Sequence, residues 1–149
     1  LRLPEPQKEK KSETGWEPVI TAFICSWCAA GAADLAGDSQ LQYSPGVRLV
    51  KVPCVGRINP LYIIKALQKG TDGVLVVGCH PQDCHFISGN LVQRRKFGVI
   101  KQYLGYLCID PDRVQFTWVS ASEGSRFAAL VNKLVNDVKQ LGPQKQLLK

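Results

Sequence analysis

The sequence predicts an α/β domain with a small, doubly wound, flavodoxin-like sheet of four parallel strands in the order 2-1-3-4, with flanking helices. Short apolar segments alternate with segments of helical periodicity along the chain, which is typical of parallel strands joined by right-handed crossovers. The length of 149 residues fits one domain. We expect this domain to span residues 17–142, between a tail or linker at residues 1–16 and a short tail at residues 143–149.

Four strands are predicted, at residues 19–25, 47–52, 73–78 and 114–119. The first and third are apolar throughout, which is typical of strands buried on both faces. The second alternates Val and Leu with Arg and Lys. This alternation favours an edge strand with one face in solvent.

Helices are predicted between and after these strands, at residues 28–36, 60–69, 90–107 and 123–141. Gly37 is the expected stop of the first helix. Asn59 is a good N-cap for the second, because Pro60 follows it at the first helical position. Ser120 and Glu123 have the spacing of a capping box at the start of the last helix.

The composition excludes several classes of protein. At 45% hydrophobic and 21% charged residues, the chain can form a core and is not disordered throughout. No apolar run reaches the ~18 residues of a membrane span, and residues 1–11 lack the apolar core of a signal peptide. The net charge of +7 comes without a basic stripe interleaved with aromatic residues, which argues against nucleic acid. Phosphate-binding glycine motifs and a Ser/His/Asp constellation are missing, so no catalytic residue is expected.

Five of the six cysteines are expected to meet at one edge of the sheet. Each lies just after a predicted strand or at the start of the helix that follows it. The five are Cys25, Cys28, Cys54, Cys79 and Cys84. Because the carboxyl ends of parallel strands lie at the same edge, where ligands bind in such folds, these thiols should cluster. Cys108 precedes the fourth strand and should lie at the opposite edge.

Clustered thiolates suit zinc or an iron–sulfur cluster. Cys25 and Cys28 alone could form a thioredoxin-type redox pair, but three further cysteines at the same edge are not typical of thioredoxins. Buried cysteines acting as small apolar residues are the plainer alternative. A zinc-stabilised adaptor domain and a thiol–disulfide oxidoreductase therefore stay open as alternative functions.

We favour an iron–sulfur cluster over zinc, because the domain has a full apolar core that needs no metal to fold. The start of the first helix and Arg57 would favour a negatively charged group at this edge. Four thiolates saturate a cluster, so one of the five cysteines is spare. Our first choice places Cys25 and Cys28 on one iron and Cys79 and Cys84 on the other.

Two histidines flank the cysteines that follow the third strand. His80 and His85 could serve as Rieske-type ligands. Because thiolates are already in surplus, we favour a role beside the centre as hydrogen-bond donors, or as plain loop surface.

Six short motifs together resemble one protein family. They are Cys25-Ser-Trp-Cys28, Ala33-Asp-Leu-Ala-Gly37, Val52-Pro-Cys-Val-Gly-Arg57, Gly78-Cys-His-Pro-Gln-Asp-Cys-His85, Ser88-Gly-Asn90 and Ser120-Ala-Ser-Glu-Gly124. Over residues 17–142 the chain resembles the delta (iron–sulfur) subunit of methyl-viologen-reducing hydrogenase. The stretch from Gly78 to His85 is the most specific of the six.

The resemblance implies a non-catalytic relay component of a cytoplasmic, anaerobic oxidoreductase complex. Such subunits carry a [2Fe-2S] cluster on cysteines, and the family's five cysteines correspond to the five named above. They link a nickel–iron hydrogenase or a formate dehydrogenase to the flavin-bearing A subunit of heterodisulfide reductase, where electrons are bifurcated, as in methanogenesis. Similar subunits occur with methylenetetrahydrofolate reductase. Cys108 has no counterpart in the family's pattern.

Overall fold

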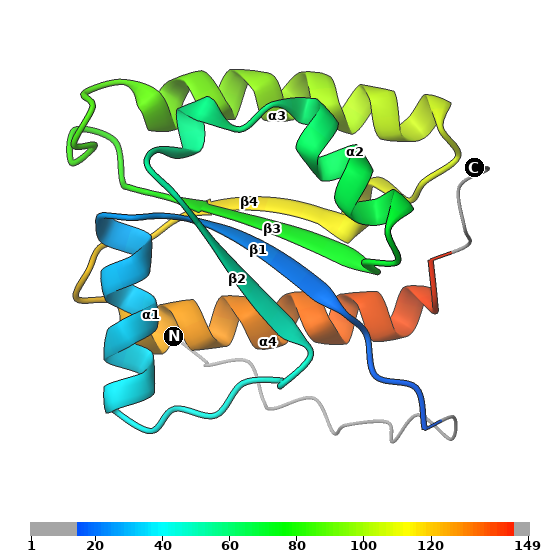
Figure 1. The fold of residues 1–149 in the computed structure, drawn as a ribbon, viewed down its shortest axis with the longest axis horizontal. Helices are drawn as coiled ribbons and strands as arrows, with labels where there is room; N and C mark the ends of the chain where they lie inside the picture. Colours follow the sequence, from blue (N-terminus) through cyan, green and yellow to red (C-terminus); the bar gives the residue numbers. More distant parts are fainter. Residues whose placement is uncertain (1–14, 145–149) are drawn as a thin grey trace, which may run out of the picture.

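Four parallel strands form the centre of the structure, in the order β2-β1-β3-β4 (Figure 1). This order confirms the fold class that the sequence predicts. The strands are β1 (Ile20–Cys25), β2 (Val47–Val52), β3 (Gly73–Gly78) and β4 (Val114–Trp118). The helices are α1 (Cys28–Asp38), α2 (Pro60–Gln68), α3 (Gly89–Tyr106) and α4 (Gly124–Leu141), with single 3-10 turns η1 (Val55–Arg57) and η2 (Pro111–Arg113). The computed structural model describes residues 15–144, so most of the two expected tails lies outside the described residues.

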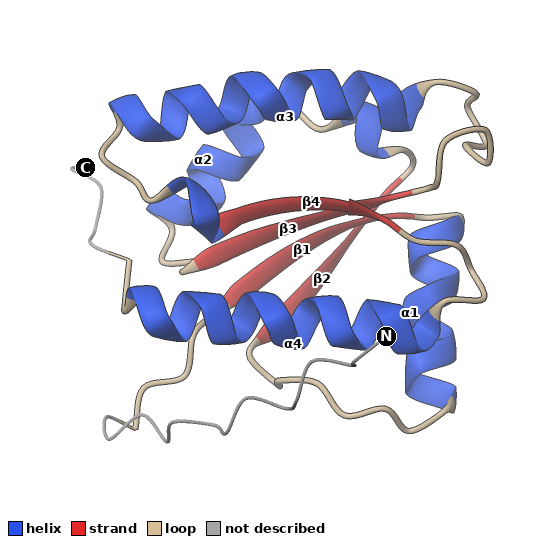
Figure 2. Cartoon of the chain, turned by 180° about the vertical axis from the view of Figure 1, so that it is seen from behind, coloured by secondary structure: helices blue, strands red, loops and turns tan. Residues whose placement is uncertain are grey.

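The sheet is a middle layer between two helix layers. Helices α2 and α3 cover one face, and α1 and α4 cover the other (Figures 1 and 2). Every residue of β3 is buried, and all of β1 except Thr21 is buried as well. Both central strands are therefore enclosed on both faces, as their unbroken apolar sequences predict.

The expectation for β2 is wrong in one respect. Its two faces are exposed alike, with Leu49 and Val50 on opposite faces at 36% and 39% exposure. The physical reason is the order of the residues. Lys51 shares a face with Leu49, and Arg48 shares the other with Val50, so each face of this edge strand carries an exposed charged side chain.

The predicted end of α1 is also wrong. Gly37 lies inside the helix, which continues to Asp38. The chain turns at Gln40, whose φ is 54°. The N–H of Gln40 bonds the carbonyl of Gly37, and the N–H of Leu41 bonds the carbonyl of Ala36, which is the Schellman pattern of helix termination.

Helices α2 and α3 end in the same way. The left-handed positions are Gly70 (φ 96°) and Cys108 (φ 56°), and their bonding partners follow the Schellman pattern. Gly70 ends α2 as predicted. Asn59 caps the start of α2 as predicted, because its side-chain oxygen accepts the N–H of Leu61 at 2.9 Å.

Candidate metal centre

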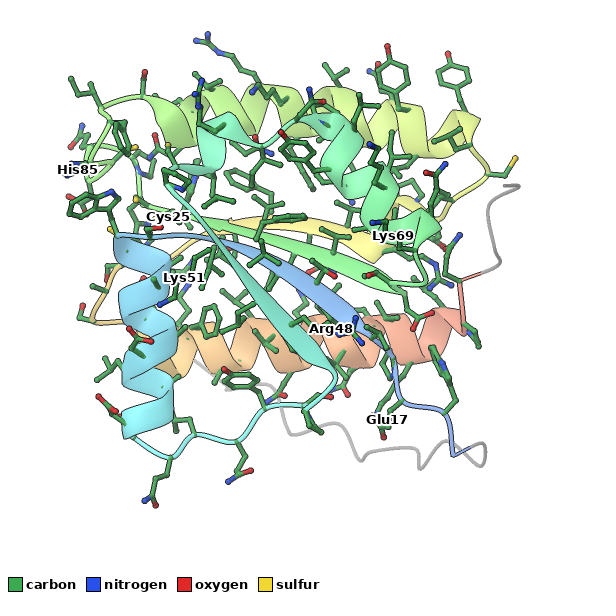
Figure 3. All side chains as sticks on the ribbon, in the orientation of Figure 1. Glu17, Cys25, Arg48, Lys51, Lys69 and His85 are labelled. Atoms are coloured by element: carbon green, nitrogen blue, oxygen red, sulfur yellow. The ribbon has the colours of Figure 1, made fainter. Side chains whose placement is uncertain are left out.

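The five cysteines meet at the carboxyl edge of the sheet, as their positions along the sequence predict. Cys25 ends β1, Cys28 opens α1, Cys54 precedes η1, and Cys79 and Cys84 lie between β3 and α3. Four of them line one recess, and Cys28 reaches it through its contact with Cys79. Figure 3 shows Cys25 at this edge beside His85. Cys108 follows α3 and precedes β4 at the opposite edge, as expected, and all six cysteines are free thiols.

The thiols contact one another in two sets. The sulfur atoms of Cys25 and Cys79 are 3.3 Å apart in a buried contact, and Cys79 also interacts with Cys28. Cys84 interacts instead with Cys54, although its place in the sequence favours a pairing with Cys79. Which four sulfurs would bind metal stays a prediction.

Two glycines form the floor under Cys54 and Cys84. A Cβ at Gly89 would overlap the sulfur of Cys54 and lie 3.5 Å from that of Cys84. A Cβ at Gly56 would lie 2.8 Å from the carbonyl oxygen of Gly89. Only bare backbone fits at either position, so the recess exists because η1 and the start of α3 pack without side chains between them. The sequence motifs include both glycines but do not reveal this role.

The surroundings shift the pKa of three of the thiols in different directions. Burial raises the pKa of Cys54, and it raises the pKa of Cys79 well above the usual range. At Cys84, burial also tends to raise the pKa. The backbone N–H groups of Asn90, Phe86 and Gly89 outweigh this effect, so the pKa of Cys84 is lowered. Two of these donors belong to the first turn of α3, where the helix dipole favours negative charge. Cys84 therefore becomes a thiolate more readily than Cys54 or Cys79.

Asn90 fixes the backbone between β3 and α3. Its side chain is fully buried, and its amide nitrogen donates to the carbonyl oxygens of Cys79 at 2.9 Å and His80 at 2.8 Å. Without these bonds the two carbonyls would lack this partner in a buried site. Sequence reasoning gave Asn90 no role, because its partners are set by the fold rather than by spacing.

His80 turns toward α4 rather than toward the thiols. Its Nε2 lies 2.8 Å from a carboxylate oxygen of Glu123, which also accepts the N–H of Ser120 at 2.8 Å. These two partners, the Ser120 N–H foremost, lower the pKa of Glu123 to about 2.

The predicted capping box at the start of α4 forms only in part. Glu123 accepts the backbone N–H of Ser120, which is one half of the motif. The other half is missing, because the Ser120 hydroxyl pairs with that of Ser122. Glu123 itself occupies the N-cap position of α4, so the expectation that Ser120 caps this helix is wrong.

The other two predicted neighbours of the centre differ in position. His85 stacks on Trp27, with ring centroids 3.6 Å apart, and lines the recess with the thiols. Arg57 is close to Cys54 in sequence, but its side chain is exposed and lines a separate hollow with Pro53 and Tyr62. Within residues 15–144, His, Cys, Asp and Glu side chains do not gather in threes around a point where a single metal ion would fit.

The fold and the site together define a doubly wound α/β domain with a cysteine-rich edge, a class suited to metal or thiol redox chemistry. Residues 20–142 match the family described as methyl-viologen-reducing hydrogenase, delta subunit, and the chain belongs to this family. Among its relatives, an iron-sulfur subunit of the F420-non-reducing hydrogenase vhc of Methanococcus voltae is 44% identical over 128 residues. That alignment covers 86% of this chain and 89% of the relative.

A second kind of relative is much longer. The A subunit of the ferredoxin/F(420)H(2)-dependent CoB-CoM heterodisulfide reductase of Methanosarcina acetivorans is 38% identical over 126 residues, which are 85% of this chain but 16% of the relative. The corresponding protein of Methanosarcina mazei matches with the same identity and coverage. None of the helices in the described part of the chain combines the length and apolar character needed to cross a membrane.

Proposed function

We propose that this chain is an electron-transfer subunit that holds a [2Fe-2S] cluster on four of its five clustered cysteines. In this proposal it relays electrons between a hydrogenase and the A subunit of heterodisulfide reductase, and it has no active site of its own. The observation that carries the proposal is the convergence of five thiols at one sheet edge in a member of the delta subunit family.

The residues at this edge fit such a group. A two-iron cluster takes four thiolates, two on each iron, and the thiols meet in two contacting sets, Cys25 with Cys79 and Cys54 with Cys84. Cys28 is the fifth candidate ligand of the cluster. The serine variants described below test our first choice of four ligands, which are Cys25, Cys28, Cys79 and Cys84, against the other combinations.

The chain's own residues would hold, orient and shield the group. Asn90 holds the backbone of Cys79, the bare backbone of Gly89 leaves space beside Cys54, and the first N–H groups of α3 stabilise negative charge on Cys84. The bound cluster would supply one-electron chemistry, and the protein would set its potential and its distance from other carriers.

The names of the relatives support the two partner enzymes in this proposal. One group is named as iron-sulfur subunits of hydrogenases, and another contains this domain within the A subunit of heterodisulfide reductase. A domain found in both settings suits a link between the two enzymes. Electron bifurcation, a formate dehydrogenase or methylenetetrahydrofolate reductase as the other partner, and a cytoplasmic location rest on the resemblance of the motifs alone and are part of the proposal.

Serine variants of single cysteines test the proposal. We expect Cys25→Ser and Cys79→Ser to lose bound iron and the visible absorption of a cluster, because both sulfurs are buried in the recess. Cys108→Ser is the matched control at the opposite edge and should keep both. Comparing Cys28→Ser, Cys54→Ser and Cys84→Ser identifies the spare thiol. A colourless, iron-free Cys108→Ser protein would contradict the assignment.

A further inference from the structure

An apolar patch lies on the outside of the thiol recess. It consists of Trp27, His85, Phe86 and Ile87, and we refer to it as the aromatic patch. Trp27 and Phe86 are about half exposed, and Ile87 is 85% exposed. The rings of Trp27 and His85 are stacked, and Phe86 meets His85 edge to face at 5.0 Å. The side chains are thus ordered against one another while facing solvent.

The aromatic patch is the outer wall of the candidate metal centre. Trp27, His85 and Phe86 line the same recess as the sulfur atoms. Trp27 lies between Cys25 and Cys28 in the chain, and residues 85–87 directly follow Cys84. The loops that carry the thiols therefore also present the patch, and a layer of rings separates this side of the centre from solvent.

Two residues of the patch are locally unfavourable in the isolated chain. Ile87 has a φ of 69°, a left-handed conformation that is a genuine outlier for a β-branched residue. Because its side chain is 85% exposed, burial in this chain does not offset the strain. Trp27 occupies the N-cap position of α1 without a side-chain capping bond, where Ser or Asp would satisfy a helix N–H. Strain of this kind persists at functional sites.

The composition of the patch is that of an interface centre. Trp, Phe and other large apolar residues are enriched at the centres of protein interfaces, and charged residues are depleted there. None of the four residues carries a fixed charge. An apolar partner surface fits this patch, whereas nucleic acid and acidic peptides do not.

The relatives indicate which partner protein binds the aromatic patch. In the two Methanosarcina chains the same domain makes up 16% of the A subunit of heterodisulfide reductase, so there it is joined covalently to the rest of that protein. In the separate hydrogenase subunits the matched region is nearly the whole chain. A separate subunit needs a surface that holds it where the fusion holds it in those relatives.

We propose that the aromatic patch is the surface on which the A subunit of heterodisulfide reductase docks, bringing its own electron carrier over the thiols. This inference rests on the proposed function. Electron transfer slows steeply with distance, so the partner's carrier belongs next to the rings that line the recess together with the thiols. In this proposal docking buries Ile87, whose side chain is exposed and whose backbone is strained in the isolated chain.

The test uses the full chain and the A subunit of heterodisulfide reductase from the same organism, purified separately without oxygen. Binding is measured by interferometry for the wild type, for Ile87→Asn and for Trp27→Ser. Asn tolerates the left-handed conformation, so the thermal unfolding midpoint of Ile87→Asn should be equal to or above that of the wild type. We expect each variant to bind this partner at least about tenfold more weakly. Ile87→Asn should keep the iron content of the wild type, because Ile87 does not line the recess.

Tyr106→Ser is the matched control. Tyr106 is also 85% exposed, but it lies at the far end of α3, about 25 Å along the helix from Gly89. It should bind like the wild type. The proposal is overturned if the wild type does not bind the partner, if Ile87→Asn binds like the wild type, or if Tyr106→Ser is equally impaired. Loss of iron from Ile87→Asn would also overturn it, because the patch would then only shield the centre.

Two further outcomes separate the claims. A dimer of this chain that dissociates on Ile87→Asn would assign the patch to self-association and overturn the proposal. If the wild type holds no iron but still binds the heterodisulfide reductase protein, and Ile87→Asn weakens that binding, the docking surface is supported while the electron-transfer proposal fails.

Discussion

At Gly89 the backbone itself forms a wall of the thiol recess. We expect Gly89→Ala to lose most of its bound iron, because the new Cβ would displace the sulfur of Cys54. Iron analysis of the purified variant measures this. The control is Gly98→Ala on the same helix, where a Cβ meets nothing within 4 Å. This variant should keep its iron and gain about 1 kcal/mol of unfolding free energy. A Gly89→Ala protein with wild-type iron content would contradict this account of the recess.

The Glu123 carboxylate gives the fold a specific dependence on pH. Its pKa is lowered from 4.5 to about 2 by the Ser120 N–H and by His80. Because the pKa is lower in the folded state, the carboxylate stabilises the fold above its ordinary pKa, and this stabilisation is lost as the pH falls from about 4.5 to about 2.

The variant Glu123→Gln removes this effect. We expect the difference in unfolding free energy between the wild type and Glu123→Gln to be constant above about pH 6 and to shrink as the pH falls toward 2. Urea titrations of the cluster-free chain at several pH values measure the difference. A gap of the same size at neutral and at acidic pH would contradict the assignment of these partners.

Among the elements, β3 and α3 are joined by one buried side chain. Asn90 donates to two carbonyl oxygens at the end of β3, so Asn90→Leu leaves both without this partner. We expect the unfolding free energy of the cluster-free chain to fall by about 3 kcal/mol in urea titrations. Asn59→Ala, which removes only the exposed cap of α2, should lower it by about 1 kcal/mol. A similar small loss for both would show that Asn90 is not a clamp.

The order of the elements could be predicted from the sequence because it depends on local patterns. Unbroken apolar runs in β1 and β3 predict their central places, and the positions of the cysteines after the strands then predict where they meet. The ends of elements were less predictable. Helix α1 continues past Gly37 because the left-handed turn falls on Gln40, a residue with no strong preference for it.

The details of the site depend on contacts between distant segments. His80 meets Glu123 across 43 positions of sequence. Cys54 joins Cys84 because Gly56 packs against Gly89. Spacing along the chain cannot reveal such pairs, so sequence reasoning found the five thiols but not their grouping, and it missed the role of Asn90.

In the whole molecule, the amino and carboxyl ends of the strands have different roles. At the amino edge, the buried side chain of Arg113 donates to the carbonyl oxygens of Asp72 and Gly142. Asp72 in turn accepts the N–H of Val19. These bonds tie the start and the end of the described chain together. The carboxyl edge instead carries the free thiols, the glycine floor and the exposed aromatic patch, so structural ties and chemistry lie at opposite ends of the strands.

The most direct test of the central claim is the metal content of the chain purified without oxygen. Iron, acid-labile sulfide and zinc are measured together with the EPR spectrum of the dithionite-reduced protein. The account predicts about two irons and two sulfides per chain, with the signal of a reduced [2Fe-2S] cluster. One zinc per chain without iron would contradict it, because the same cysteines would then form a structural site that passes no electrons.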